Sequence, residues 1–223
     1  MADDALEPKE RVGKILVLLE REYPDAKITL EFNNPLELMV ATILAAQCTD
    51  AKVNQVTRSL FKKFRTPEDY AKADSATLEG EIRPTGFYKA KAKHVKNACG
   101  ILIDQYGSQV PKTMDDLIKL PGVARKTANI VLSNAYGITE GIAVDTHVLR
   151  LVERLVLTQS RTREKIETDL MRIVPKDSWL RFSDLLIFHG RKVCTAKKPK
   201  CSICVLNDLC PSAFTFNIQQ LGG

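Results

Sequence analysis

One break between two helical patterns, near the middle of the chain, constrains the fold more than any other feature. Pro121-Gly122 interrupts the pattern, because proline lacks a backbone donor and glycine accepts positive φ. Apolar residues recur at helical spacing on both sides of the break: Met114, Leu117 and Ile118 before it, and Ala128, Val131, Leu132 and Ala135 after it. Gly137 stands where the second helix needs a C-terminal cap. The sequence therefore predicts a helix, a tight hairpin and a second helix.

The predicted hairpin and the start of its second helix suit a phosphate group. The turn is formed by Leu120, Pro121, Gly122 and Val123. Backbone N–H groups at a helix N-terminus bind anions, and Arg125 adds a positive charge there. Lys126 follows, off the apolar stripe. From spacing alone, Lys126 is a surface lysine, a phosphate contact, or a group held beside bound backbone for chemistry.

The composition is that of a globular protein with an excess of positive charge. The chain has 223 residues, of which 44% are hydrophobic and 27% charged, and its net charge is +6. Such a charge favours a polyanionic partner. The first residues are acidic and lack the apolar core of a signal peptide. No apolar run approaches the ~18 residues of a membrane span. We therefore expect no membrane partner and a cytoplasmic location.

The rest of the sequence also favours helices. Amphipathic patterns run from Lys9 to Tyr23, from Arg161 to Val174 and from Trp179 to His189. The chain shows no β alternation of useful length and no repeat of fixed period. These patterns predict an all-α fold.

Three residues stand at the ends of predicted helices. Gln47 lies in a polar break between two helices, where a solvated turn residue is the simplest interpretation. Phe87 follows the turn made by Pro84 and Gly86 and is either a core residue or an exposed wedge. Asp145 is well placed to cap the helix that follows it. The helix after Phe87 is expected to have one basic side, formed by Lys89, Lys91, Lys93 and Lys96.

The cysteines near the C-terminus indicate a metal site. The spacing C-x6-C-x2-C-x5-C is formed by Cys194, Cys201, Cys204 and Cys210. Four thiolates this close in sequence bind zinc or a [4Fe–4S] cluster. Zinc sites usually have two short CxxC pairs and this run has one, which favours the cluster. The lysines between the first two cysteines, presented to phosphates or forming a solvated charge run, are Lys197, Lys198 and Lys200.

The stretch LPGVARKTANIVL, the later VDTHVLR and the cysteine run together resemble the endonuclease III family of DNA glycosylases. The family usually has glycine where this chain has Ala124. The resemblance covers most of the chain and implies two helical domains with a DNA-binding cleft between them. One domain, expected at 28–138, contains the helix-hairpin-helix. The other, expected at 1–27 plus 139–223, contains a [4Fe–4S] cluster held by the four cysteines.

The resemblance also implies an activity. A bifunctional DNA glycosylase/AP lyase of base excision repair would remove oxidised pyrimidines from duplex DNA containing damaged bases, as a monomer in the nucleoid of a prokaryote. Lys126 would attack C1′ of the flipped nucleotide and Asp145 would assist it. Gln47 would fill the vacated stack and Phe87 would act as a wedge. The further residues implied to contact DNA are Leu120, Pro121, Gly122, Val123, Arg125, His147, Arg191, Lys197, Lys198 and Lys200.

Three other functions compete with this interpretation. An adenine glycosylase of the same superfamily has a catalytic glutamate before the glutamine, usually lacks the lysine and carries a further C-terminal domain. Here the stretch from Ala41 to Gln47 contains no acid, and Lys126 is present. A non-catalytic DNA-binding module does not need Lys126 together with Asp145. A cluster-bearing electron carrier leaves the basic hairpin unexplained.

Overall fold

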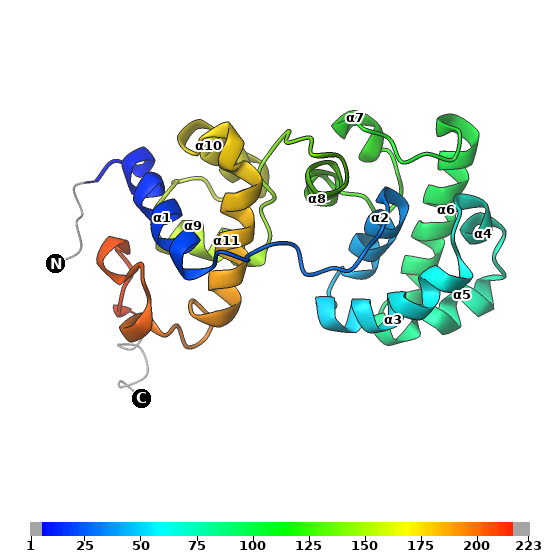
Figure 1. Ribbon diagram of the computed structural model, residues 1–223, viewed down its shortest axis with the longest axis horizontal. Coiled ribbons are helices and arrows are strands. Elements are labelled where there is room, and N and C mark those ends of the chain that lie inside the picture. The colour runs from blue at the N-terminus through cyan, green and yellow to red at the C-terminus, as the bar shows by residue number, and fades with distance from the viewer. Residues whose placement is uncertain (1–5, 216–223) are drawn as a thin grey trace. The chain divides into compact units, whose positions relative to one another are not determined.

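The protein folds into helices joined by short loops, as a computed structural model that describes residues 6–215 shows (Figure 1). No strand occurs within that range, which confirms the all-α prediction. The chain divides into two compact units. Unit 1 combines the segment up to Lys27 with the segment from Gly141 onward, and unit 2 is the continuous segment Ile28–Glu140. No helix among the described residues is long and apolar enough to cross a membrane.

Unit 2 is built from helices, most of which begin at a residue whose side chain caps the first turn. Its elements are α2 (Pro35–Leu44), α3 (Asp50–Lys63), α4 (Pro67–Lys72), α5 (Ser75–Ile82), η1 (Arg83–Thr85), α6 (Tyr88–Tyr106), α7 (Met114–Leu117) and α8 (Arg125–Tyr136). Asn34 begins α2 by accepting a hydrogen bond from the N–H of Glu37. Thr66 and Asp69 form a reciprocal capping box at α4. Gly137, at φ 68°, ends α8 as predicted.

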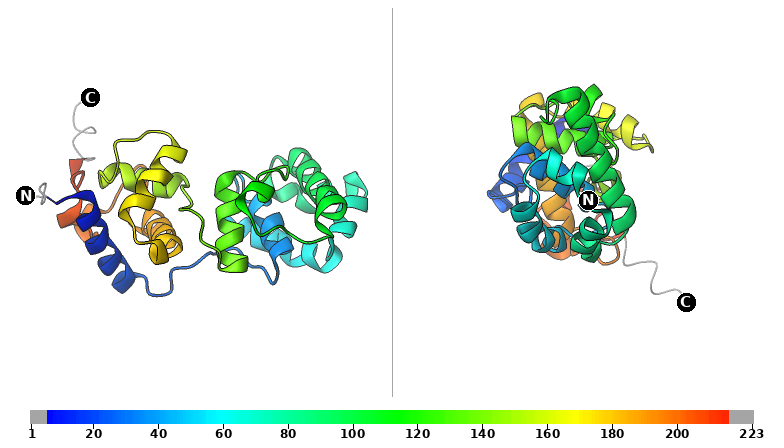
Figure 2. Two further views of the ribbon diagram at one scale, coloured as in Figure 1. Left: turned by 90° about the horizontal axis from the view of Figure 1, so that it is seen from above. Right: turned by 90° about the vertical axis from the view of Figure 1, so that its right-hand side faces the viewer.

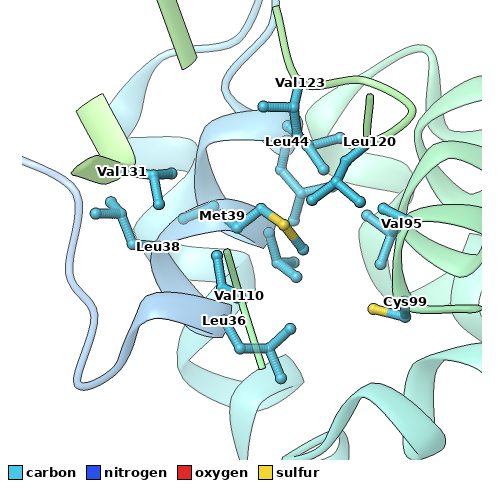
Figure 3. Close-up of a cluster of buried hydrophobic side chains, with 14 of the residues drawn as sticks. Leu36, Leu38, Met39, Leu44, Val95, Cys99, Val110, Leu120, Val123 and Val131 are labelled. Carbon is cyan, nitrogen blue, oxygen red and sulfur yellow. The ribbon is translucent and has the colours of Figure 1, made fainter. Parts of the chain in front are cut away.

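The core of unit 2 surrounds α2, which is apolar on nearly every side. The residues from Leu38 to Leu44 are all buried. Helices α3, α6 and α8 pack against them. Figure 3 shows this cluster, with residues of α2 between Val95 and Cys99 of α6 and Val131 of α8. Cys99 is a buried core residue, and burial raises the pKa of its thiol to about 12.

Unit 1 combines one helix from the first part of the chain with helices from its last third. Its elements are α1 (Pro8–Glu22), α9 (Thr146–Arg154), α10 (Arg163–Ile173), η2 (Lys176–Ser178), α11 (Trp179–Lys192), η3 (Cys201–Ile203) and η4 (Asn207–Leu209). Helix α1 lies beside α11 (Figures 1 and 2). The guanidinium of Arg181 on α11 donates to the carbonyls of Tyr23 and Pro24, each at 2.9 Å, and fixes the end of α1. The core of unit 1 includes Ile15, Leu19, Val152, Phe182 and Leu186.

Candidate functional site

The hairpin between α7 and α8 is anchored by buried side chains and presents its backbone to solvent. The N–H of Val123 donates to the carbonyl of Leu120 at 3.0 Å and closes the turn. Leu120 and Val123 point into the core of unit 2, beside Leu44 (Figure 3). Their side chains therefore hold the turn in place, and their N–H groups are used within the chain, since that of Leu120 donates to the carbonyl of Leu117 at 3.1 Å. Gly122 is exposed at the tip.

Glycine is required at position 122 for two reasons. Its φ is +82°, in the left-handed region that L side chains rarely adopt. A Cβ built on it would lie 3.0 Å from Cβ of His94 on α6. Ala124, in contrast, has φ −83° and ψ 167°, which any residue adopts without strain. Alanine in place of the glycine that the family usually has at this position therefore leaves the hairpin backbone in an ordinary conformation.

Lys126 is the second residue of α8 and is exposed. Ala124, the N-cap residue of α8, has no side-chain oxygen, so α8 lacks a side-chain cap, as α6 does, whereas side chains cap α2, α3, α4, α5 and α7. Lys126 therefore stands at a positive helix end whose N-cap side chain provides no acceptor.

Asp145 caps α9, as predicted. Its Oδ1 accepts hydrogen bonds from the N–H groups of His147 and Val148, each at 2.8 Å. The residue is 8% exposed. Both N–H groups donate to Oδ1, so the second carboxylate oxygen, Oδ2, is not used in capping α9. Burial, together with the charge of Arg150, lowers the pKa of His147, whose Nδ1 lies 3.0 Å from a guanidinium nitrogen of Arg150.

Gln47 and Phe87 stand on strained turns of unit 2. Both have a left-handed backbone, with φ 54° and φ 48°. Phe87 is 66% exposed, so the core alternative for this residue is wrong. Gln47 is also exposed. The expected basic side of α6 needs a correction as well, because Lys91 is buried and donates to two backbone carbonyls.

The four C-terminal cysteines occupy one loop after α11. All four are free and partly buried. Burial, and then the charges of the Cys194, Cys210 and Cys201 thiolates, raise the pKa of Cys204 to about 11. Coordination to iron would deprotonate these thiols. The lysines of the same loop are exposed: Lys197, Lys198 and Lys200.

Arg154, the last residue of α9, attaches this loop to the helix. Its guanidinium donates to Sγ of Cys194 at 3.1 Å and to the carbonyls of Thr195 and Ala196, each at 2.9 Å. The Cys210 thiol lies 3.5 Å from the carbonyl of Arg154. A positive group at the sulfurs favours their thiolate form, which the predicted cluster needs.

A buried histidine connects the loop to α1. The Nε2 of His189 lies 3.2 Å from Sγ of Cys204, and its Nδ1 lies 3.1 Å from the hydroxyl of Tyr23. Burial lowers the pKa of His189 to about 4, which keeps the ring neutral, and raises that of Tyr23 to about 12. The arrangement that satisfies each atom has Tyr23 donating to Nδ1 and Nε2–H donating to sulfur.

The donor set fits an iron–sulfur cluster. Four thiols stand on one loop, and N–H groups of Arg154 and His189 lie within hydrogen-bond distance of two of their sulfurs. In the part of the chain that the structure describes, no group of three or more His, Cys, Asp or Glu residues is arranged to hold a metal ion. In a [4Fe–4S] cluster the cysteines bind different iron atoms, so their sulfurs lie farther apart than the ligands of a single ion.

Comparison with known protein families assigns the α7–α8 hairpin and the cysteine loop to the same class of protein. Residues 40–176 match the family described as HhH-GPD superfamily base excision DNA repair protein. Residues 194–210, which contain all four cysteines of the run, match the iron–sulfur binding domain of endonuclease III. The first match spans the hairpin, Lys126 and Asp145. Fold and site therefore define a base-excision DNA repair protein that carries a [4Fe–4S] cluster.

Similar proteins of known family identify the class more closely. Endonuclease III of Synechocystis sp. is 47% identical over 92% of this chain and 94% of its own length. Endonuclease III of Bacillus subtilis is 46% identical over 84% of this chain and 86% of its own. A solved non-covalent endonuclease III–DNA complex superposes with a TM-score of 0.89, at 43% identity, over 93% of this chain and 97% of that one. The chain belongs to the endonuclease III family, whose members are DNA glycosylases with AP lyase activity.

Sequence reasoning missed the residues that support the site. Lys91 and Arg154 belong to no sequence motif, and nothing distinguishes either of them from the many other basic residues on helices. His189 and Tyr23 are far apart in the sequence, and only the packing of α1 on α11 brings them together. The one available signal was a histidine on the mainly apolar helix α11, five residues before Cys194.

Replacing Gly122 tests the hairpin geometry. Gly122→Ala should lower the free energy of unfolding by about 1–2 kcal/mol, because alanine is strained at positive φ and its Cβ meets His94. It should also weaken binding to duplex DNA. Thermal unfolding and a binding titration measure the two effects. Gly137→Ala, at a φ of 68° but with open space around the added Cβ, is the control for backbone strain alone. Equal DNA affinity of the two variants would contradict a role for the hairpin tip.

Replacing Arg154 tests how the cysteine loop is held. Arg154→Met keeps an unbranched apolar stem but removes the guanidinium that donates to Cys194, Thr195 and Ala196. The variant should lose its absorption near ~400 nm, which thiolate-bound iron produces, faster than the unchanged protein in the presence of a chelator. Arg172→Met is the matched control, because its guanidinium is exposed and lies 3.6 Å from Asp169 of its own helix. Equal rates of loss for the two variants would contradict the assignment.

Proposed function

We propose that this chain removes oxidised pyrimidines from duplex DNA with Lys126 as the nucleophile and then cuts the strand by β-elimination. The observation that carries the proposal is the position of Lys126. It is an exposed amine at the start of α8, directly after a hairpin whose backbone suits a phosphate. A base inside a duplex is out of reach of such an amine, so the damaged nucleotide must leave the stack.

The amine accounts for both steps. The Nζ of Lys126 forms a bond to C1′, and the bond from C1′ to the base breaks with its electron pair going to the base, which takes up a proton. The sugar ring opens and leaves an imine between Lys126 and C1′. The imine acidifies the C2′ proton, and loss of that proton expels the 3′ phosphate. A water nucleophile would stop at the abasic site, so the choice of nucleophile decides whether the strand is cut.

Asp145 has the chemistry to support this amine. One of its oxygens is used in capping α9, and the other is available to accept a proton from the amine or to stabilise positive charge on the sugar. Because Lys126 is exposed in the protein alone, its desolvation must come from the bound DNA.

The remaining residues bind and reshape the duplex. Gln47 and Phe87, both exposed, would fill the space that the extruded nucleotide leaves. We propose Cys194, Cys201, Cys204 and Cys210 as the four cluster ligands. The bound cluster would stiffen the loop that presents its lysines to phosphates. The solved endonuclease III complexes contain DNA, which supports DNA as the partner. We propose that this chain acts on duplex DNA as a monomer in the nucleoid.

A non-catalytic DNA-binding module is the second candidate, and imine trapping separates the two. Borohydride should reduce the imine and join the protein covalently to damaged DNA. Lys126→Gln should abolish the adduct and leave fold and colour intact. Asp145→Asn should slow base release strongly at nearly unchanged stability, because asparagine caps helices about as well as aspartate. Lys119→Gln, which removes an exposed charge near the hairpin, is the control. An adduct at normal yield with Lys126→Gln would assign the chemistry to another amine.

The exposed lysines of the cysteine loop should contribute to the salt dependence of DNA binding. Changing Lys197, Lys198 and Lys200 to Ala should weaken DNA binding, because exposed lysines on a fixed loop neutralise phosphates. Each lost phosphate contact should reduce the slope of log K against log[salt] by ~0.9. The same change at three other exposed lysines of unit 1, Lys9, Lys14 and Lys165, should leave the slope nearly unchanged. Equal slopes for the two triple variants would mean that the loop lysines face solvent in the complex.

A further inference from the structure

We propose that Lys91 is a positioning residue that holds the turns of Gln47 and Phe87 in the conformation required to enter the base stack. The inference rests on the proposed function of those two residues. Lys91 lies in the first turn of α6 and is 4% exposed. Its Nζ donates to the carbonyl of Leu44 at 2.7 Å and to the carbonyl of Thr85 at 2.8 Å. One ammonium group therefore connects two turns that are far apart in the sequence.

The first of these bonds stabilises the end of α2. In a continuing helix the N–H of Cys48 would donate to the carbonyl of Leu44. Here it donates to Ala45 at 3.1 Å, and the backbone at Gln47 turns to φ 54°. The ammonium of Lys91 supplies the donor that the helix no longer gives to Leu44. A buried carbonyl without this donor would favour another helical turn, which would move Gln47.

The second bond fixes the turn that presents Phe87. Thr85 is buried, and its hydroxyl donates to the carbonyl of Ile82 at 2.8 Å. After it, Gly86 and Phe87 both have positive φ, 72° and 48°. Lys91 holds both ends of this segment, because its backbone N–H donates to the carbonyl of Phe87 at 3.0 Å and its ammonium donates to Thr85. The exposed ring of Phe87 thus stands on a backbone attached on both sides to one residue.

The residues next to Lys91 on α6 are apolar, so packing alone does not require a charged side chain at this position. Its neighbours on α6, Ala92 and Val95, are core residues. Burial lowers the pKa of the Lys91 ammonium, which shows that its position is costly for the charged form. An apolar side chain of similar length would fill the same space without that cost. What it would lack is the pair of donors that joins the Gln47 and Phe87 turns.

The experiment compares Lys91→Met with Lys93→Met, which removes the same charge from an exposed position two residues away. Single-turnover base release is measured at saturating protein, on a duplex with an oxidised pyrimidine and 2-aminopurine beside it. Lys91→Met should lower the rate roughly tenfold to a hundredfold and reduce the rise in 2-aminopurine fluorescence. Its affinity for undamaged duplex and its helix content should match those of Lys93→Met. Strand cleavage at a preformed abasic site, where no base must be unstacked, should change less.

A double-mutant cycle separates positioning from general destabilisation. If Lys91 acts through Phe87, the loss caused by Lys91→Met should shrink in a Phe87→Ala background. Full additivity, or a rate for Lys91→Met equal to that of Lys93→Met, would overturn the inference. If Lys91→Met does not fold, Lys91→Gln, whose shorter amide reaches at most one carbonyl, is subjected to the same cycle. Absence of base release by the unchanged protein would instead refute the proposed function.

Discussion

The enclosure of α2 in apolar surroundings is the constraint on which unit 2 depends. Every residue from Leu38 to Leu44 is buried, and a helix that is apolar all round is stable in water only when other elements surround it. Helices α3, α6 and α8 provide that cover. The hairpin is attached to the same core, since Leu120 and Val123 lie beside Leu44 (Figure 3). The hairpin is therefore held by a packed core as well as by its own hydrogen bonds.

Backbone strain in unit 2 gathers where the family resemblance implies contact with DNA. Gln47 and Phe87 are two of the five described non-glycine residues with positive φ, and Gly86 and Gly122 also have positive φ. Each strained non-glycine residue costs of order 1–3 kcal/mol. Such a cost persists only where the surrounding structure enforces it, as the core does at the hairpin. Exposed side chains on strained turns are thus fixed in direction before any ligand arrives, which reduces the entropy lost on binding.

Local rules predicted the local features of the structure. The helices followed from apolar periodicity, and the cap at Asp145 and the terminating Gly137 from residue type and position. The burial of Lys91 could not be predicted, because its pattern on α6 is that of a surface lysine and its partner Leu44 lies 47 residues away. Whether Lys126 is exposed could not be predicted for a related reason. Desolvation depends on what surrounds a side chain, and the spacing of neighbours along one helix does not specify that.

The division of the chain has a consequence for how the protein is made. Unit 2 is one continuous segment, so its helices are synthesised one after another without interruption. Helix α1, in contrast, can pack only after α11 has been synthesised. At usual rates of synthesis that delay is on the order of ten seconds. Throughout it, Ile15 and Leu19 have no native partner on α11. Tyr23 likewise meets His189 only at the end. The iron-binding loop is thus completed last, on a nascent chain whose central unit is already able to fold.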